Sequence, residues 1–241
     1  MSEVDSRLVL DALVAEGDEL DALVAEHDWT TATPAAGWTI AHQIAHLAAA
    51  DANVVAAIRT PDAFGTVPKD SDLVAAEGAA TPRDVLLEQW RSGRAEVVAA
   101  LREIRQEQGF PWFGAEVTAQ LMAPLRLMET WAHGQDVFDA LGVKRNPTAR
   151  LQHVAFLGVT GRTLSFYAAE LPIPQEPFRV ELTGPDGEAW AWGPSDAAQR
   201  IRGSAEDFCL RVTHRRSRAE TGLTAVGDDA DTWLDVARVF L

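Results

Sequence analysis

The sequence reads LMAPLRLMETWAHGQDVFDAL over residues 121–141, and a helix built from this stretch is apolar on almost every side. A helix with this pattern is buried, so it must pack inside a larger assembly. Four ionisable residues nevertheless gather on one side of it: Arg126, Glu129, His133 and Asp136. Buried charges must be paired or must bind a metal, so this side is the first candidate for a functional site.

Helical spacing of apolar residues predicts three more helices before this one, at about residues 8–24, 39–59 and 82–104. The helix that carries the charges is predicted from about 118 to 141, with Gly142 as its stop. Four amphipathic helices in a row predict an antiparallel bundle. Residues 60–80 collect Pro, Gly and Asp and are predicted as a long loop with room for one short turn, a type of segment that often forms a lid. The tryptophans at helical spacings are predicted to lie in the core: Trp29, Trp38, Trp90 and Trp131.

The pattern changes after a further helix that is predicted from Asn146-Pro147 to about Leu171. Residues 178–182 and 189–192 form a predicted hairpin, because polar and apolar residues alternate around the turn Gly184–Gly187. Short strands and helices then follow one another to the end of the chain. The fold class is therefore mainly α plus α+β, with domains at 1–146 and 147–241.

Composition limits the partners. The chain has 241 residues, of which 47% are hydrophobic, and a formal net charge of −15. Such a charge repels phosphate backbones and anionic lipid headgroups, so neither nucleic acid nor a membrane is the expected partner. The lone Cys209 and the acidic N-terminus predict a cytoplasmic protein with an inert buried thiol. A monomer and a homodimer are both compatible with the sequence.

Two pairs of side chains have the spacing of metal ligands. Glu129 and His133 lie one helical turn apart, and so do His42 and His46 on the second helix. Two His and one Glu around a divalent ion with an open position form a catalytic ligand set rather than a closed structural one. Such pairs also occur as surface ion pairs or as hydrogen-bonded core histidines, and spacing alone leaves these alternatives open.

Two segments carry a family resemblance: GWTIAHQIAHL at residues 37–47 and RLMETWAHGQDV at residues 126–137. They resemble the mycothiol-dependent maleylpyruvate isomerase family, within the DinB-like bundle superfamily. In the C-terminal part, GSAEDF at residues 203–208, followed by Thr213-His214-Arg215, resembles the family's sterol-carrier-like α+β domain. The family's Trp-Gly before the Arg is Thr213-His214 in this chain.

The resemblance implies a DinB-like four-helix bundle in which His46, Glu129 and His133 hold a divalent metal, commonly zinc. Two His and a carboxylate also suit nickel, iron or manganese. Arg215 is the position that matches an active-site Arg of the family's second domain. His42 lies outside the general pattern and is predicted to orient a ligand or to act as a general base.

The leading hypothesis is a metal-dependent enzyme that activates a low-molecular-weight thiol, such as mycothiol as cosubstrate, for attack on a small electrophile. The reaction would be a transfer or a cis-trans isomerisation. Arg126 and Asp136 would orient the ligands or balance charge, His42 would handle protons, and Arg215 would steer a substrate carboxylate. Two other hypotheses are a hydrolase that uses a metal-bound water and a non-catalytic protein that binds an apolar small molecule, because a fold does not fix a function.

Overall fold

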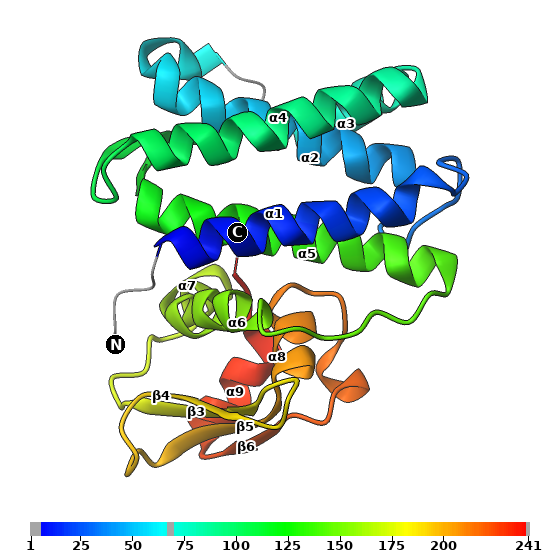
Figure 1. Cartoon of the computed structure of the whole chain (residues 1–241). Coiled ribbons are helices and arrows are strands. Elements are labelled where there is room, and N and C mark those ends of the chain that lie inside the picture. Colours follow the sequence, from blue (N-terminus) through cyan, green and yellow to red (C-terminus); the bar gives the residue numbers. More distant parts are fainter. Residues whose placement is uncertain (1–5, 67–69, 240–241) are drawn as a thin grey trace. The chain divides into compact units, whose positions relative to one another are not determined.

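The computed structural model describes residues 6–66 and 70–239. The chain divides into two compact units, Met1–Arg145 and Asn146–Leu241. The predicted fold class is confirmed: a helical N-terminal part is followed by an α+β part (Figure 1).

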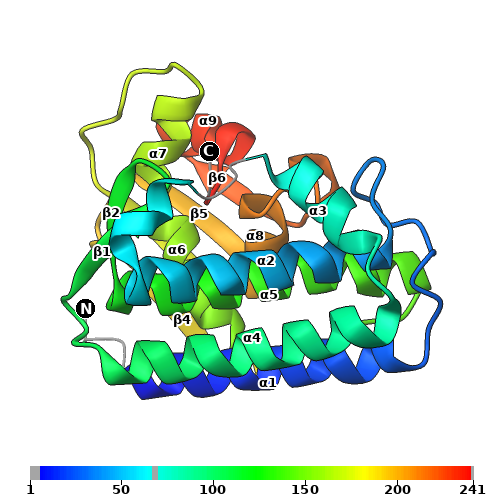
Figure 2. The ribbon, with the colours of Figure 1, turned by 90° about the horizontal axis from the view of Figure 1, so that it is seen from above.

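Four long helices form the first unit: α1 (Ser6–Ala25), α2 (Ile40–Arg59), α4 (Arg83–Glu103) and α5 (Ala119–Leu141). Helix α1 packs on α5 and α2 packs on α4 (Figure 2). Ion pairs show that α1 and α4 are antiparallel, because Asp11 meets Arg102 at 3.1 Å and Asp18 meets Arg94 at 2.7 Å. Helix α5 ends at Gly142, which adopts the left-handed conformation (φ 63°) that favours glycine.

The prediction of a long loop over residues 60–80 is wrong. This segment contains a 3₁₀ helix, η1 (Pro61–Thr66), and the helix α3 (Ser71–Ala79), which packs on α2. Ala75 is its only buried residue, so α3 has no apolar stripe that periodicity could detect. The chain returns along α3, and α4 therefore runs in the same direction as α2, so this pair departs from the antiparallel arrangement that the sequence predicts (Figure 2).

Two other local predictions need correction. A short antiparallel hairpin, β1 (Gly109–Trp112) and β2 (Ala115–Thr118), joins α4 to α5, a connection for which the sequence analysis predicts no strand. The single helix predicted from Asn146 to Leu171 is two helices, α6 (Leu151–Thr160) and α7 (Arg162–Ala168), separated at Gly161.

The second unit contains a four-stranded sheet with the strand order β4-β3-β5-β6. Its strands are β3 (Phe178–Thr183), β4 (Ala189–Trp192), β5 (Gln199–Ser204) and β6 (Thr224–Val226). The pair β3–β5 is parallel, whereas β3–β4 and β5–β6 are antiparallel. The sheet packs against α8 (Ala205–Val212) and α9 (Asp228–Val236), and a short 3₁₀ turn, η2 (Arg218–Glu220), precedes β6.

Within residues 6–66 and 70–239, no helix is both long and apolar enough to cross a membrane.

One buried ion pair joins α2 to α5 inside the bundle. The Arg126 Nε and Nη2 atoms lie 3.1 and 3.0 Å from Asp51 Oδ1, and both side chains are almost fully buried. Burial raises the pKa of the Asp51 carboxyl, and the charge and hydrogen bond of Arg126 act in the opposite direction. Each charge therefore depends on the other to remain in the interior.

We predict that Asp51→Ala lowers the free energy of unfolding by about 3–5 kcal/mol, because it leaves the Arg126 charge buried without its partner. Urea unfolding followed by circular dichroism measures this loss. The matched control is Asp11→Ala, which breaks the exposed pair with Arg102 and should cost about 0–1 kcal/mol. Equal losses in the two variants would contradict this account of the pair.

Candidate metal centre

Helices α2 and α5 bring three possible metal ligands to one point. The Nε2 atom of His46 lies 3.3 Å from Glu129 Oε2, and the Nε2 atom of His133 lies 3.3 Å from the same oxygen. One ligand atom from each residue falls within 4.8 Å of the other two. The predicted residues from two distant segments therefore converge in space.

The separations fit ligands of one metal better than direct ion pairs. A charged N–H···O hydrogen bond is usually about 2.7–2.9 Å long, which is shorter than the observed 3.3 Å. Two ligands of a tetrahedral zinc, each bound at about 2.0–2.1 Å, lie about 3.3 Å apart. The donor set of two imidazoles and one carboxylate is also the set that zinc accepts in sites with an open position.

A chain of hydrogen bonds fixes the tautomer of His133. Thr33 Oγ1 donates to the Trp38 carbonyl oxygen at 3.1 Å, so its lone pair is available to accept from Gln43 Nε2 at 2.9 Å. Gln43 Oε1 then faces His133 Nδ1 at 2.6 Å. Because an amide oxygen only accepts, His133 Nδ1 carries the proton.

This tautomer places the lone pair of neutral His133 on Nε2, facing the Glu129 carboxylate. Two lone pairs at that distance repel each other unless a positive ion lies between them, and that ion is either a proton or a metal. Gln43 is fully buried on α2, so its amide cannot easily turn away. The geometry of the chain's own atoms therefore calls for a cation at this point.

In the metal-free protein a proton on His133 Nε2 takes the place of this cation, and the electrostatics of Glu129 describe that form. Burial alone would raise its pKa, but hydrogen bonds with His133 and His46, together with the charges of His133 and Arg126, hold the pKa well below its usual value. The carboxylate is therefore ionised at neutral pH and ready to bind a cation.

The two predicted supporting residues lie beside the ligands. Asp136 Oδ2 is 4.0 Å from His133 Nδ1, whereas Gln43 Oε1 makes the closer contact with that nitrogen. Arg126 forms its ion pair with Asp51, and its charge also contributes to the low pKa of Glu129. The roles predicted for Arg126 and Asp136 remain proposals.

His42 caps the helix on which it lies. Its Nδ1 atom accepts from the backbone N–H of Thr39, the N-cap residue of α2, at 3.3 Å. Among the described residues, the group of candidate ligand atoms comprises those of His46, Glu129 and His133 and does not include His42. Because the cap engages Nδ1, a proton transfer by His42 would use Nε2.

Arg215, the other predicted catalytic residue, belongs to the second unit. It follows the end of α8, where its backbone N–H donates to the Leu210 carbonyl at 2.8 Å and its Nη1 donates to the Thr213 carbonyl at 2.8 Å. The expectation that it steers a substrate stays a prediction.

The prediction that Cys209 is an inert thiol agrees with the structure. Its side chain is fully buried, and burial raises the pKa of the thiol well above its usual value.

Two site residues were missed in the sequence. Trp38 was assigned to the core with Trp29, Trp90 and Trp131, but it is only half-buried and lies beside the histidines, while the other three are buried. Gln43 was not predicted as a site residue, because a single glutamine near two histidines matches no ligand pattern. One sequence signal could have identified it: Gln43 lies three residues before His46, and residues with this spacing are neighbours on the surface of a helix.

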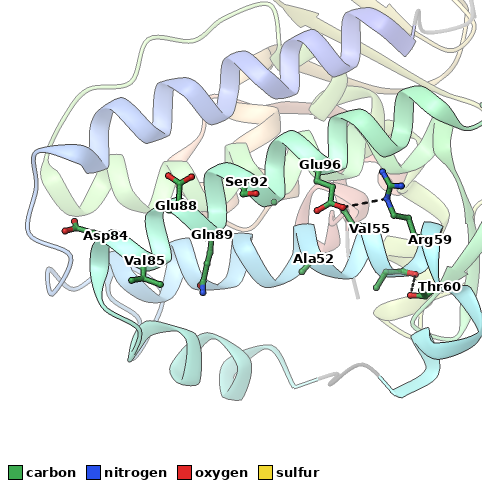
Figure 3. Close-up of a pocket in the computed structure, with 12 residues that line it drawn as sticks. Ala52, Val55, Arg59, Thr60, Asp84, Val85, Glu88, Gln89, Ser92 and Glu96 are labelled. Carbon is green, nitrogen blue, oxygen red and sulfur yellow. Dashed lines mark hydrogen bonds and ion pairs between the residues drawn. The ribbon is translucent and has the colours of Figure 1, made fainter.

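A surface groove of about 930 Å³ lies elsewhere in the bundle, between α2 and α4 (Figure 3). Small or apolar side chains such as Ala52 and Val55 line it together with the ion pair Arg59–Glu96, whose Nε and Oε1 atoms are 3.7 Å apart. The lining includes none of the three candidate ligands, so the groove is separate from the metal centre.

Comparison with known families supports the resemblance. Residues 10–138 match the sequence profile described as the mycothiol maleylpyruvate isomerase N-terminal domain. Residues 174–225 match a second profile, described as wyosine base formation. The likeness of the C-terminal part to a sterol-carrier domain stays a prediction.

Two curated relatives extend over nearly the whole chain. Both are described as uncharacterized proteins of Mycobacterium tuberculosis, one from strain CDC 1551 / Oshkosh and one from strain ATCC 25618 / H37Rv. Each is 46% identical over 239 residues, which cover 95% of this chain and 93% of the relative.

Two solved structures share the fold. The crystal structure of the mycothiol-dependent maleylpyruvate isomerase matches with a TM-score of 0.65 and 18% identity, and that of a histidine-to-alanine mutant with 0.65 and 17%. Each match covers 92% of this chain and 93% of the other.

We predict that Glu129→Gln destabilises the metal-free protein at pH 7 and that the difference from wild type shrinks as the pH falls. The folded-state pKa of Glu129 is lowered, so its ionised form stabilises the fold above the unfolded-state value of about 4.3. This contribution is lost as the pH falls through the folded-state pKa. Urea unfolding in the presence of a chelator, between pH 7 and pH 3, measures it.

The control for this series is Glu88→Gln, which changes an exposed carboxylate on α4. A stability difference for Glu129→Gln that stays constant over the whole pH range would show that the pKa of Glu129 is not lowered.

Proposed function

The chain belongs to the mycothiol maleylpyruvate isomerase family. On this basis we propose that it is a divalent-metal-dependent enzyme that uses the low-molecular-weight thiol mycothiol. The thiol would either catalyse the isomerisation of a small electrophile or be transferred to it. The family membership supports the thiol and the class of reaction. The observation that carries the metal is the convergence of His46 Nε2, His133 Nε2 and Glu129 Oε2.

His46, Glu129 and His133 would hold the metal, and zinc suits this donor set best. Nickel, iron and manganese are the alternatives, because imidazole and carboxylate ligands bind them as well. When bound, a divalent ion stabilises the thiolate form of a thiol at neutral pH and so makes it a nucleophile.

The residues around the ligands would divide the remaining work. Gln43 keeps the proton of His133 on Nδ1, so that Nε2 stays available as a ligand atom. His42, whose Nδ1 is occupied at the helix cap, would give or take a proton at Nε2. Arg126 and Asp136 would balance charge, and Arg215 of the second unit would pair with a substrate carboxylate.

An isomerisation by this route consumes no thiol. The thiolate sulfur would add to one carbon of a conjugated cis double bond, and the electron pair would move onto the conjugated carbonyl. The former double bond can then rotate, and expulsion of the thiolate restores the double bond in the trans form. Transfer would instead end with the thiol joined to the electrophile.

We predict that the protein purified without chelator contains about one equivalent of divalent metal and that His46→Ala, Glu129→Ala and His133→Ala each lose it. Three convergent ligands define the site, and removing one leaves too few for tight binding. Elemental analysis measures the metal content. His27→Ala is the control, because His27 contacts the Leu23 carbonyl and takes no part in the cluster.

Activity assays on the same variants decide among the hypotheses. Turnover that needs both metal and added thiol supports the proposal. Turnover that needs metal but no thiol would favour a hydrolase, and full metal content in His133→Ala would overturn the ligand assignment.

We also predict that Gln43→Leu weakens zinc binding by about 10–100-fold, because it removes the acceptor that orients His133. Gln43→Glu keeps an acceptor at the same place and should bind nearly as tightly as wild type. Competition with a chromophoric chelator measures both affinities. Gln89→Leu, an exposed change on α4, is the control, and wild-type affinity in Gln43→Leu would show that Gln43 does not orient the ligand.

A further inference from the structure

Trp38 lies among all three histidines of the candidate site. Its ring centroid is 5.9 Å from that of His133, with the planes nearly parallel at 18°. It is 5.5 Å from the His46 ring and 6.2 Å from the His42 ring. The indole of Trp38 therefore lies against histidines of both α2 and α5.

The backbone before α2 holds Trp38 in this place. The Trp38 carbonyl accepts hydrogen bonds from both the backbone N–H and the hydroxyl of Thr33, at 2.8 and 3.1 Å. The Trp38 N–H donates to the Ala35 carbonyl at 2.9 Å, across a turn that contains Gly37 at φ 79°. Only glycine adopts that φ without strain.

A second anchor comes from α3. The indole Nε1–H donates to Asp72 Oδ1 at 2.8 Å, although the two residues are 34 positions apart. Helix α3 begins at the N-cap Asp70, whose side chain accepts from the Leu73 N–H at 3.0 Å. The segment that carries Asp72 is therefore an ordered helix.

Helix α3 also lies unusually close to α2. A Cβ atom at Gly78 would come within 2.8 Å of the Ala45 Cβ, so the glycine permits a close approach of the two helices. Ala45 is the residue before His46. The anchor of the indole is thus fixed to the same helix that carries one of the candidate ligands.

We infer that Trp38 is a positioning residue that closes one side of the metal centre and that Asp72 holds it there, an inference that rests on the proposed function. The indole confines the two candidate imidazole ligands and excludes water from their side of the cluster. The hydrogen bond to Asp72 stops the indole from turning outward. The pair thereby limits how fast a metal leaves and how a thiol or an electrophile enters.

Cobalt(II) tests this inference, because its visible absorption reports binding independently of activity. Bound cobalt should quench the fluorescence of a tryptophan this close, and Trp38→Phe should remove most of that quenching. Removal of cobalt by excess chelator should be about tenfold faster in Trp38→Ala and in Asp72→Ala than in wild type.

Two further variants separate the hydrogen bond from a general effect on α3. Asp72→Asn keeps an oxygen acceptor for the indole and should exchange cobalt at the wild-type rate. Glu77→Ala removes an exposed carboxylate from the same helix and should also leave the rate unchanged.

The outcomes distinguish this inference from the proposed function. Wild-type exchange rates in both Trp38→Ala and Asp72→Ala, with cobalt bound normally, would overturn the positioning role and leave the metal centre intact. Absence of cobalt binding to the wild type would overturn both. Faster exchange in Asp72→Asn that equals that of Asp72→Ala would show that the hydrogen bond is not the cause.

Discussion

The hydrogen bond between His133 Nδ1 and Gln43 Oε1 is the contact on which the site depends, because it decides which nitrogen of the imidazole faces Glu129. The pair also belongs to a larger pattern along the interface of α2 and α5. Three ionisable side chains of α5 have a partner on α2: His133 pairs with Gln43, Glu129 with His46, and Arg126 with Asp51. A shift of either helix by one turn would separate all three pairs at once. The polar contacts therefore fix the register of two helices whose apolar contacts alone would tolerate sliding.

Sequence periodicity was sufficient for the long helices but not for the elements that complete the site. Each bundle helix buries an apolar stripe, so its spacing is visible in the sequence. Helix α3 buries only Ala75 and approaches α2 at Gly78, which has no side chain. Such a contact leaves no pattern of apolar residues in the sequence. The β1–β2 hairpin turns at Phe113 and Gly114, both with positive φ, and its strands are too short to show alternation.

The spacing of Glu129 and His133 showed that they share a face, because one helical turn separates them. The choice between His42 and His46 needed the family resemblance, since both lie on the same side of α2 and either could meet α5. The structure gives the physical reason for a difference: His42 lies in the first turn, where its Nδ1 accepts from the Thr39 N–H. The sequence could not give the roles of Trp38 and Gln43, because their partners lie far along the chain, at Asp72 and His133, and no local pattern connects them.

Different elements of the bundle hold the candidate ligands and the indole of Trp38, which forms one wall of the site. The candidate ligands stand on two long helices whose mutual register is fixed by buried polar pairs, so their positions tolerate little change. The wall is formed by Trp38, which the turn at residues 33–38 and the surface helix α3 hold in place. Substitutions on the exposed side of α3, such as at Asp72, can reshape the entrance without moving the candidate ligands, whereas Thr33 in the turn also supports the contact between Gln43 and His133. Changes around Trp38 and Asp72 would therefore alter access to the centre, whereas changes among the candidate ligands would alter metal binding itself.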